Sequence, residues 1–239
     1  MTASASIDVL ILCGGLGKRL KPALGEQQKV LAHIGKRPFL DILIDDLAQQ
    51  GFQRFVLCAG FQSQAVQEYV RNKKSSYQFE VSREEKPLGT GGAIKNAEAF
   101  VRSPRFLALN GDSFCRLDIQ KMVAFHCEHK ALATIALTRV KDSREFGAIK
   151  MDDEMRITSF KEKDAGEGSL LINAGIYCFE KEIFPLMPPA KAFSIEHDFF
   201  PTLIGKRFYG FKTEGDFLDI GTPDRYNHAK TYFKKEGHA

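Results

Sequence analysis

The stretch of sequence that decides the fold is IDVLILCGGLGKRL at residues 7–20. Residues 7–13 form a short, largely apolar run, which is typical of a strand buried on both faces of a sheet. A glycine-rich loop follows at once, with Gly14, Gly15 and Gly17. Because α/β sheets bind their ligands beyond the carboxyl ends of strands, this order predicts an α/β fold with a ligand loop after its first strand.

Strand-like and helix-like patterns alternate downstream of this loop, with short connections between them. The predicted helices cover residues 39–50, 64–71, 90–101 and 118–129, and a further one begins at Thr222-Pro223-Asp224. The predicted strands cover residues 55–59, 79–82, 105–109, 132–138, 148–151, 157–161, 170–179, 208–212 and 217–220. Such alternation favours a parallel sheet wrapped by helices, so we expect a three-layer α/β/α sandwich with a mixed, mostly parallel sheet.

The length and patterning favour a single domain over residues 1–239. The chain shows no linker, no internal repeat and no low-complexity tract. In particular, no hexapeptide repeat follows the last predicted elements, so we expect no C-terminal β-helix.

The composition indicates which kinds of binding partner to expect. Apolar residues make up 44% of the chain and charged residues 27%, with a net charge of +4 spread along the sequence. Its 20 Phe and 6 Tyr residues are also scattered, and Trp is absent, so no stacking platform for nucleic acid is visible. We expect no nucleic-acid partner, whereas a mild positive charge suits small polyanionic substrates.

The five cysteines are odd in number and form no C-x-x-C pair, so a disulfide framework or a cysteine zinc site is not expected. The start MTASASID lacks the basic and apolar regions of a signal peptide, and no apolar stretch reaches ~18 residues. We therefore expect a cytoplasmic protein without a membrane partner.

The loop at residues 14–20 carries Lys18 and Arg19 directly after its glycines. Glycines let backbone N–H groups approach phosphate oxygens, and the two cations add positive charge there. The loop is not a Walker A motif, since no Ser or Thr follows Lys18, and Leu20 stands where G-x-G-x-x-G needs its third glycine. A phosphate site is favoured, and the alternative is a plain tight turn between strand and helix.

The same loop resembles the signature of the sugar-1-phosphate nucleotidyltransferases, G-G-x-G-T-R-L followed about ten residues later by a lysine. Gly14, Gly15, Gly17, Arg19 and Leu20 match it, and Lys29 lies at the expected distance. Two positions depart from the pattern: Lys18 replaces a threonine, and Gln28 replaces a proline. Enzymes of this family join a nucleoside triphosphate to a sugar 1-phosphate with Mg²⁺ and release pyrophosphate, so the resemblance implies that activity.

Two more segments resemble the nucleotide side of this family. The loop PLGTGGA at residues 87–93 would lie against the base and ribose, although such a turn at the start of a helix is a weak signal alone. LNGD at residues 109–112 ends a predicted strand. The resemblance implies nucleotide contacts from Leu12, Gly14, Gly15, Gly17, Lys18, Glu84, Pro87, Gly89 and Thr90.

The metal site is expected at two aspartates. Asp112 ends LNGD, and Asp219 lies among apolar residues in FLDIGTP at residues 217–223. A carboxylate within an apolar strand is costly to bury unless it is paired or metal-bound, and Mg²⁺ takes one or two carboxylates plus substrate phosphates. Helix capping by either aspartate is the alternative.

The sugar side of the resemblance lies in the second half of the chain. FKEKD at residues 160–164 resembles F-x-E-K-P, with Asp164 in place of the proline, so Glu162 would bind sugar hydroxyls and Lys163 the sugar phosphate. Gly111, Gly147 and Asn173 complete the expected sugar-phosphate contacts. Without the other motifs, Lys163 would be read as a solvated charge in a charged run.

These roles divide the domain into a nucleotide-binding half, about residues 1–115, and a sugar-phosphate half, about residues 116–239. Arg19, Lys29, Asp112 and Lys163 are the expected catalytic residues, since they would counter the repulsion between two polyanionic substrates. A homodimer is a possible assembly. A glycosyltransferase is disfavoured because no D-x-D motif lies near Asp112, and a non-catalytic sensor of the same fold is disfavoured because these residues are all present.

The base is expected to be read by Glu84, where family members that use uridine or thymidine triphosphates have glutamine. An ionised glutamate only accepts hydrogen bonds, which suits the adjacent N1–H and N2 amino donors of guanine. The competing interpretation is a solvated residue in the run REEK, with Glu85 as an equal candidate. The motifs are most similar to guanylyltransferases of D-glycero-α-D-manno-heptose 1-phosphate and mannose 1-phosphate, with a uridylyl-, thymidylyl- or cytidylyltransferase for another hexose 1-phosphate as the alternative.

One further cluster suggests zinc, namely His126 and His129 around Cys127 and Glu128. The two histidines lie three residues apart on a predicted helix that looks exposed, and no second pair of ligands is near in sequence. We therefore do not expect a zinc site there.

Overall fold

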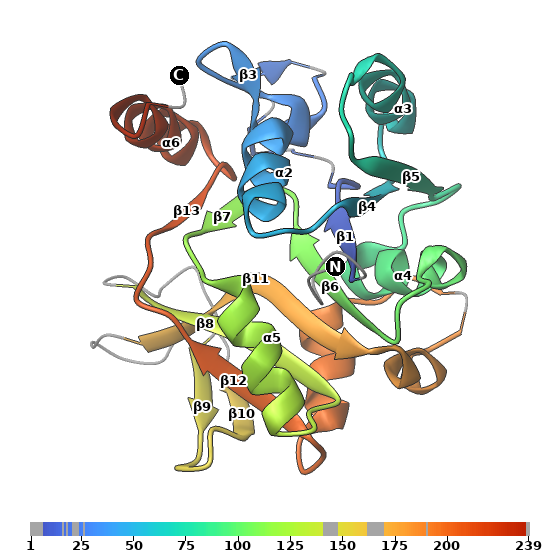
Figure 1. Ribbon diagram of the computed structural model, residues 1–239, viewed down its shortest axis with the longest axis vertical. Helices are drawn as coiled ribbons and strands as arrows, with labels where there is room; N and C mark the ends of the chain where they lie inside the picture. Colours follow the sequence, from blue (N-terminus) through green and yellow to red (C-terminus); the bar gives the residue numbers. More distant parts are fainter. Residues whose placement is uncertain are drawn as a thin grey trace.

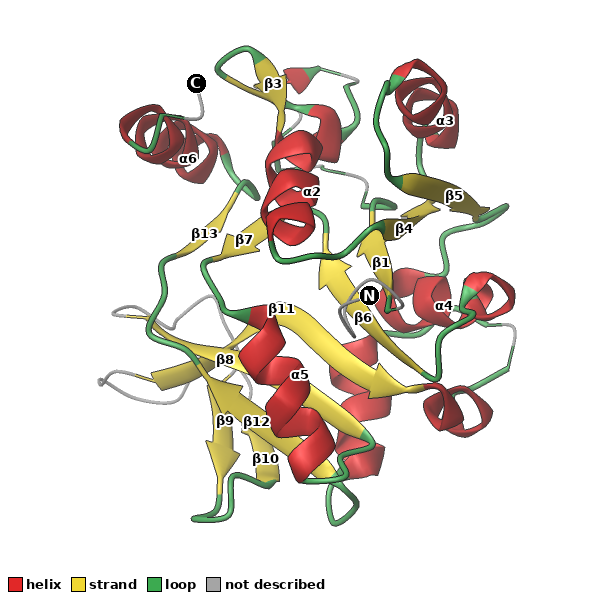
Figure 2. Ribbon diagram, in the orientation of Figure 1, coloured by secondary structure: helices red, strands yellow, loops and turns green. Residues whose placement is uncertain are grey.

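The chain folds around one large sheet with helices on both faces (Figures 1 and 2). The computed structural model describes residues 7–15, 17, 19–20, 24–25, 27–140, 148–161, 170–189 and 191–237. The central strand order is β10-β9-β11-β6-β1-β4-β5, and β8 pairs with both β11 and β12. The strands of this sheet are β1 (Asp8–Leu12), β4 (Arg54–Ala59), β5 (Gln78–Arg83), β6 (Arg105–Asn110), β8 (Ala133–Val140), β9 (Ala148–Met151), β10 (Ile157–Lys161), β11 (Leu170–Glu180) and β12 (Phe208–Lys212).

The sheet is parallel in its first half and mixed in its second. β1 lies between β6 and β4, and β4 pairs with β5, all in parallel. β11 then runs antiparallel to β6, β8 and β9, whereas β12 is parallel to β8. Because β6 bonds to β1 on one side and to β11 on the other, one continuous sheet runs through both halves of the chain.

Helices cover the two faces according to the alternation of apolar side chains along the strands. Leu10, Val56 and Phe106 pack in one core with residues of α4 and the following 3-10 and π turns, whereas Val9, Phe55 and others pack with α2, α3 and α5 in a second core. In Figure 1 α5 crosses in front of β8 and β11. The helical elements are α2 (Phe39–Gln49), α3 (Ser63–Asn72), α4 (Gly89–Asn96), α5 (Ile119–Glu128), α6 (Pro223–Lys235), η2 (Lys29–Leu31), η3 (Glu98–Phe100), η4 (Lys181–Leu186), η5 (Ile195–Phe199) and η6 (Phe200–Leu203).

A third apolar cluster joins the end of the chain to its beginning. The ribbon of β7 (Ser113–Cys115) and β13 (Phe217–Asp219), the small hairpin of β2 (His33–Ile34) and β3 (Arg37–Pro38), and α6 meet there. Phe233 of α6 packs edge-on against Phe39 and Phe114. This cluster therefore places β13 beside the segment that follows β6.

The structure confirms the predicted three-layer α/β/α architecture, and the predicted helices and strands appear near their expected positions. Thr222 caps α6 by accepting from the Arg225 N–H, with Pro223 in the first turn, as its sequence predicts. The helix predicted at residues 90–101 is shorter, because α4 ends at Asn96 and a 3-10 turn follows. The sequence analysis did not anticipate β2, β3, β7 or the turns between residues 181 and 203.

The predicted exposure of the histidine cluster is wrong for His126. That side chain is fully buried, and its Nδ1 lies 2.8 Å from the hydroxyl oxygen of Thr134. Burial is the main cause that lowers the pKa of His126, to about 3, so the ring is neutral. No cluster of three or more potential metal ligands occurs among the described residues, and no described helix is long and apolar enough to cross a membrane.

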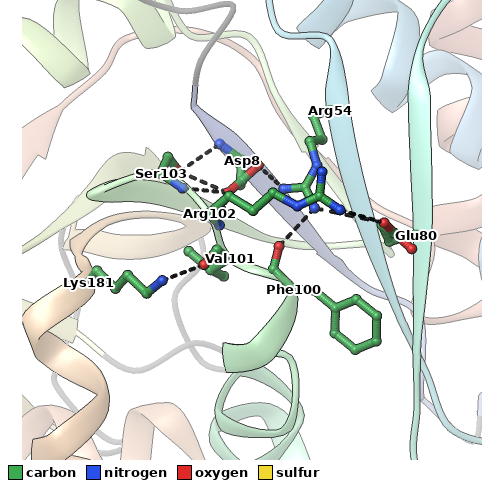
Figure 3. A network of polar contacts seen from close by, with 8 residues as sticks. All are labelled: Asp8, Arg54, Glu80, Phe100, Val101, Arg102, Ser103 and Lys181. Atoms are coloured by element: carbon green, nitrogen blue, oxygen red, sulfur yellow. Dashed lines mark hydrogen bonds and ion pairs between the residues drawn. The ribbon is translucent and has the colours of Figure 1, made fainter.

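A polar network at the amino end of the sheet fixes the segment that follows α4 and η3 (Figure 3). The Asp8 carboxylate pairs with Arg54 and accepts from the backbone N–H groups of Arg102 (2.5 Å) and Ser103 (2.8 Å). Arg54 also donates to the Phe100 carbonyl at 2.9 Å. These bonds hold residues 100–103 in a non-helical segment, in which Val101 is extended, so a helix cannot continue to residue 101.

We expect Asp8→Asn to destabilise the protein by about 3 kcal/mol at neutral pH, because the change leaves the buried Arg54 charge without its partner. Burial alone would raise the pKa of Asp8, but the bonds from Ser103, Arg54 and Arg102 lower it overall. The stabilisation is therefore present above the unfolded-state pKa and is lost as the pH falls through the folded-state value. Urea denaturation at pH about 7 and about 3 measures this loss.

The exposed variant Asp153→Asn is the matched control and should change the unfolding free energy little at either pH. An Asp8→Asn cost that stayed the same in acid would show that the carboxylate charge is not what stabilises this segment.

Candidate active site

A pocket of about 290 Å³ opens at the carboxyl ends of the parallel strands. Leu12 of β1 lies in register with Cys58 of β4 and Asn110 of β6, so the loops that leave these strands meet at one edge. The pocket is lined by Leu12, Cys13, Gly14, Gly15, Gln28, Lys29, Val30, Glu84, Pro87, Gly89, Thr90, Ala93, Asn110 and Asp112. Segments from four parts of the sequence thus converge on one cavity, and most of the expected nucleotide contacts are among them.

The three glycines of the first loop are explained by different features of the structure. A Cβ on Gly14 would lie 2.7 Å from Oε1 of Glu84 and 3.2 Å from the Gly60 nitrogen, so a side chain there would displace the oriented carboxylate. A Cβ on Gly15 would meet no atom within 4 Å, so its backbone faces open space in the pocket wall. Gly17 has a φ of +57°, in the left-handed region that favours glycine. The plain-turn interpretation therefore accounts for Gly17 but not for Gly14.

Gln28 performs the role of the family proline and adds hydrogen bonds of its own. Its φ of −62° is a value that a proline ring imposes. The buried side chain caps η2 by accepting from the Val30 N–H at 3.0 Å and donates to the Cys13 carbonyl. It thereby ties the start of the glycine loop to the turn that carries Lys29.

Lys29 and both expected metal ligands lie close together. Its ammonium nitrogen is 2.6 Å from Oδ2 of Asp112. The β7–β13 ribbon pairs Asp219 with Ser113, the neighbour of Asp112, and the Ile220 N–H donates to the Asp112 carbonyl at 3.0 Å. Asp219 in turn pairs with Arg225 of α6 at 3.0 Å. Neither aspartate caps a helix of the described part of the chain, which excludes the capping alternative for these helices.

The Arg19 side chain lies close to Lys29 and Asp219. A Cβ on Gly221 would lie 3.6 Å from Nη2 of Arg19, 3.6 Å from Nζ of Lys29 and 2.7 Å from Oδ1 of Asp219. The two cations predicted to bind phosphate therefore face one of the two carboxylates across a glycine. Positive and negative groups are interleaved here, as a site that binds both phosphates and a divalent cation requires.

The donor set suits Mg²⁺. Two carboxylates stand on adjacent chain segments, and their side chains are 44% (Asp112) and 15% (Asp219) exposed. Mg²⁺ in phosphate-transfer sites takes one or two carboxylates and completes its shell with water and phosphate oxygens. Asp112 and Asp219 are thus the residues that would hold it.

Glu84 lies in the wall of the pocket and is only 9% exposed, whereas Glu85 is exposed. The solvated-loop interpretation of Glu84 is therefore excluded. Its Oε2 accepts from the Leu88 N–H at 2.8 Å, which orients the carboxylate. Burial raises the pKa of Glu84 above its usual value, and the bond from Leu88 limits the rise.

The loop at residues 87–93 contributes Pro87, Gly89 and Thr90 to the pocket, but two of its glycines serve another purpose. The Phe193 carbonyl accepts from the N–H groups of Gly91 (3.1 Å) and Gly92 (3.4 Å), the first-turn donors of α4. A Cβ on Gly91 would lie 2.1 Å from the Phe193 ring. The chain itself therefore occupies the N–H groups of Gly91 and Gly92, and these two are not left for a phosphate.

On the sugar side, Gly111 is fixed by packing, since a Cβ there would lie 2.6 Å from the Leu12 carbonyl oxygen. Asn173 lies on β11, and its side chain bonds to Gly175, Tyr177 and Glu196. Lys18, Gly147, Glu162 and Lys163 lie outside the described residues.

The sequence analysis missed Asn110, Phe193 and Glu196, and it treated Gln28 only as a departure. Asn110 directly precedes Gly111 in LNGD, so the motif itself held that signal. Phe193 and Glu196 lie in a stretch with no motif. A one-chain sequence offers no sign that residues about 100 positions from Thr90 would seal the start of α4.

We expect Gln28→Ala to lower the unfolding free energy by about 1–3 kcal/mol, because the Cys13 carbonyl and the Val30 N–H lose a buried partner. The kcat should also fall, since the turn that holds Lys29 is then less well placed. Gln27→Ala, at the exposed neighbouring position, is the control. Calorimetry and steady-state kinetics measure both effects, and an unchanged melting temperature in Gln28→Ala would contradict this role.

Comparison with known proteins agrees with this geometry. The nucleotidyl transferase family profile matches residues 8–236. The D-glycero-alpha-D-manno-heptose 1-phosphate guanylyltransferase of Aneurinibacillus thermoaerophilus is 36% identical over 226 residues, covering 94% of this chain and 97% of the relative. The mannose-1-phosphate guanylyltransferase of Mycobacterium tuberculosis is 31% identical over 228 residues, covering 94% of this chain and 64% of the relative.

Among solved structures, HddC from Yersinia pseudotuberculosis has a TM-score of 0.84 at 34% identity, covering 95% of this chain and 99% of that one. The same values hold for HddC complexed with GMP-PN. A family match over nearly the whole chain, supported by full-length relatives above 30% identity, shows that this protein belongs to the nucleotidyl transferase family.

Proposed function

We propose that this protein transfers GMP from GTP to a manno-configured sugar 1-phosphate, either D-glycero-α-D-manno-heptose 1-phosphate or mannose 1-phosphate, and releases pyrophosphate. The observation that carries the proposal is the buried, oriented Glu84 carboxylate in the pocket wall. The names of full-length relatives support both the base and the sugar class.

Base recognition follows from hydrogen-bond complementarity. The ionised Glu84 side chain only accepts, and guanine presents the N1–H and N2 amino donors side by side. Uracil and thymine would set a carbonyl oxygen against the same carboxylate, which costs ~1–3 kcal/mol or more for mispaired buried groups. Leu88 holds the carboxylate in place before the base arrives, so little ordering remains to be done on binding.

The reaction joins two polyanions. An oxygen of the sugar phosphate attacks the α-phosphorus of GTP, a new P–O bond forms, and the bond to the departing pyrophosphate breaks. The nucleophile is already anionic, so its attack needs no general base. The main task of the protein is to hold the reacting groups in line and to offset their charge.

The positions of the described cations support this proposal. Arg19 would neutralise the departing pyrophosphate, and Lys29, held at 2.6 Å from Asp112, would face the α-phosphate. A divalent cation on Asp112 and Asp219 would supply further charge neutralisation and orient the phosphate oxygens. Lys163, by the family pattern, would bind the attacking phosphate, with Glu162, Asn173 and the backbone at Gly111 and Gly147 around the sugar.

The proposal assigns the nucleotide to residues 1–115 and the sugar phosphate to residues 116–239 of one domain. A cytoplasmic location and a homodimer stay predictions of the sequence. A matrix of nucleoside triphosphates against sugar 1-phosphates, with pyrophosphate release as the readout, tests the assignment directly. A clear preference for glucose 1-phosphate over both manno-configured sugars would overturn the sugar class.

We expect Asp112→Asn to lower kcat by ~10²-fold or more, on the scale of a lost electrostatic contribution to the transition state. Activity should also require Mg²⁺ and stop in EDTA. Asp153→Asn, an exposed change of the same kind, should keep wild-type turnover. Full turnover in EDTA, or wild-type kcat in Asp112→Asn, would refute the assignment of this carboxylate to the metal.

We expect Glu84→Gln to reduce the ratio of kcat/KM for GTP over UTP by ~10-fold or more, because an amide presents a donor to the N1–H or amino group of guanine. Glu85→Gln should keep the wild-type ratio, since that side chain is exposed. The raised pKa of Glu84 adds a pH test, because protonation replaces an acceptor by a donor. The KM for GTP should therefore rise as the pH falls through that pKa. A variant with unchanged GTP preference would exclude Glu84 as the base reader.

A further inference from the structure

A short segment that carries no recognisable motif connects the two sides of the site. Phe193 bonds through its carbonyl to the start of α4 and through its N–H to the Leu88 carbonyl at 2.9 Å. The Ile195 N–H donates to the hydroxyl of Thr90, also at 2.9 Å. Residues 193–195 are thus anchored to the nucleotide loop mainly by backbone groups.

The next residue reaches the opposite side. Glu196, in the first turn of η5, accepts through Oε1 from Nδ2 of Asn173 at 2.7 Å. The hydroxyl of Tyr177 lies 3.3 Å from the same oxygen and 2.8 Å from Nδ2 of Asn173. Tyr177 is fully buried, so this cluster is shielded from water on one side.

These contacts use most of the hydrogen-bonding capacity of Asn173. Its Nδ2 has two hydrogens, and Glu196 and Tyr177 are the acceptors next to it. Its Oδ1 accepts from the Gly175 N–H at 2.8 Å, which leaves a second lone pair. A flipped amide would place Oδ1 against the Glu196 carboxylate, so the charge of Glu196 selects one orientation.

We propose that Glu196 is a positioning residue for the sugar phosphate: it locks the Asn173 amide so that Oδ1 presents an acceptor to a sugar hydroxyl. This inference rests on the proposed function, because it takes Asn173 as part of the sugar site. It changes the expected role of Asn173 from a general polar contact to an acceptor held in one orientation. Glu196 acts through Asn173 and forms no bond to the reacting atoms.

The geometry also predicts that a change of Glu196 affects the two substrates differently. The anchors of the segment on the nucleotide loop are the backbone groups of Phe193 and Ile195, and a change of the Glu196 side chain leaves them in place. Loss of Glu196 should therefore weaken sugar-phosphate binding and spare GTP. A residue that only stabilised the fold would affect both substrates alike.

The test is steady-state kinetics of Glu196→Ala and Glu196→Gln with GTP and mannose 1-phosphate, or with whichever sugar 1-phosphate the wild type turns over. For Glu196→Ala we expect the KM for the sugar phosphate to rise about tenfold or more, as for loss of a charged hydrogen-bond partner, with the KM for GTP within about twofold. Glu196→Gln keeps an oxygen acceptor and should recover part of the loss. Glu182→Gln, an exposed glutamate paired with Arg207, is the control.

A second readout needs no substrate. The side-chain amide signal of Asn173 in a ¹⁵N spectrum, assigned by its loss in Asn173→Asp, should move in Glu196→Ala and stay in Glu182→Gln. A failure of the wild type to use GTP would overturn the proposed function and leave this structural test intact. An unmoved Asn173 signal, or equal rises in both KM values, would overturn the role of Glu196.

Discussion

The site depends on one close backbone approach, in which the Gly111 N–H donates to the Leu12 carbonyl at 3.0 Å. A side chain at position 111 would collide with that carbonyl oxygen and with Val30. This contact closes the gap between the loops that follow β1 and β6. It sets Asp112 beside Lys29, and the proposed phosphate site is built around that pair.

The charges around this contact are balanced before any substrate is present. Asp112 pairs with Lys29, and Asp219 pairs with Arg225. Without a partner, burying each of these charged groups at the edge of the core would cost desolvation free energy. The pairing therefore stabilises the folded protein. A metal ion could replace the cations as partner of the carboxylates, and phosphates could replace the carboxylates as partner of the cations. This exchange is possible because carboxylates and cations alternate in the site.

A second constraint couples the nucleotide loop to the sugar half. The Phe193 carbonyl accepts from the Gly91 and Gly92 N–H groups of α4. Glycine is required at position 91 because the Phe193 ring lies where a side chain would be, and at position 89 because the Phe193 carbonyl oxygen does. The L-G-T-G-G motif is therefore required for packing against a distant segment as well as for the proposed nucleotide contact. The pocket keeps its shape because both halves of the chain build this corner.

The sequence by itself determined the α/β/α architecture, since buried strands and amphipathic helices are encoded by local periodicity and by glycine and proline signals. It also predicted Arg19, Lys29, Asp112 and Asp219 as site residues from short motifs, and Glu84 from its spacing to the L-G-T motif. Only the tertiary structure decided that Glu84 rather than Glu85 faces the pocket, that His126 is buried, and that Gln28 holds the glycine loop. Only it linked Phe193 and Glu196 to Thr90 and Asn173. Burial and long-range hydrogen bonds depend on which elements pack together in the folded chain. Local sequence patterns do not encode that packing.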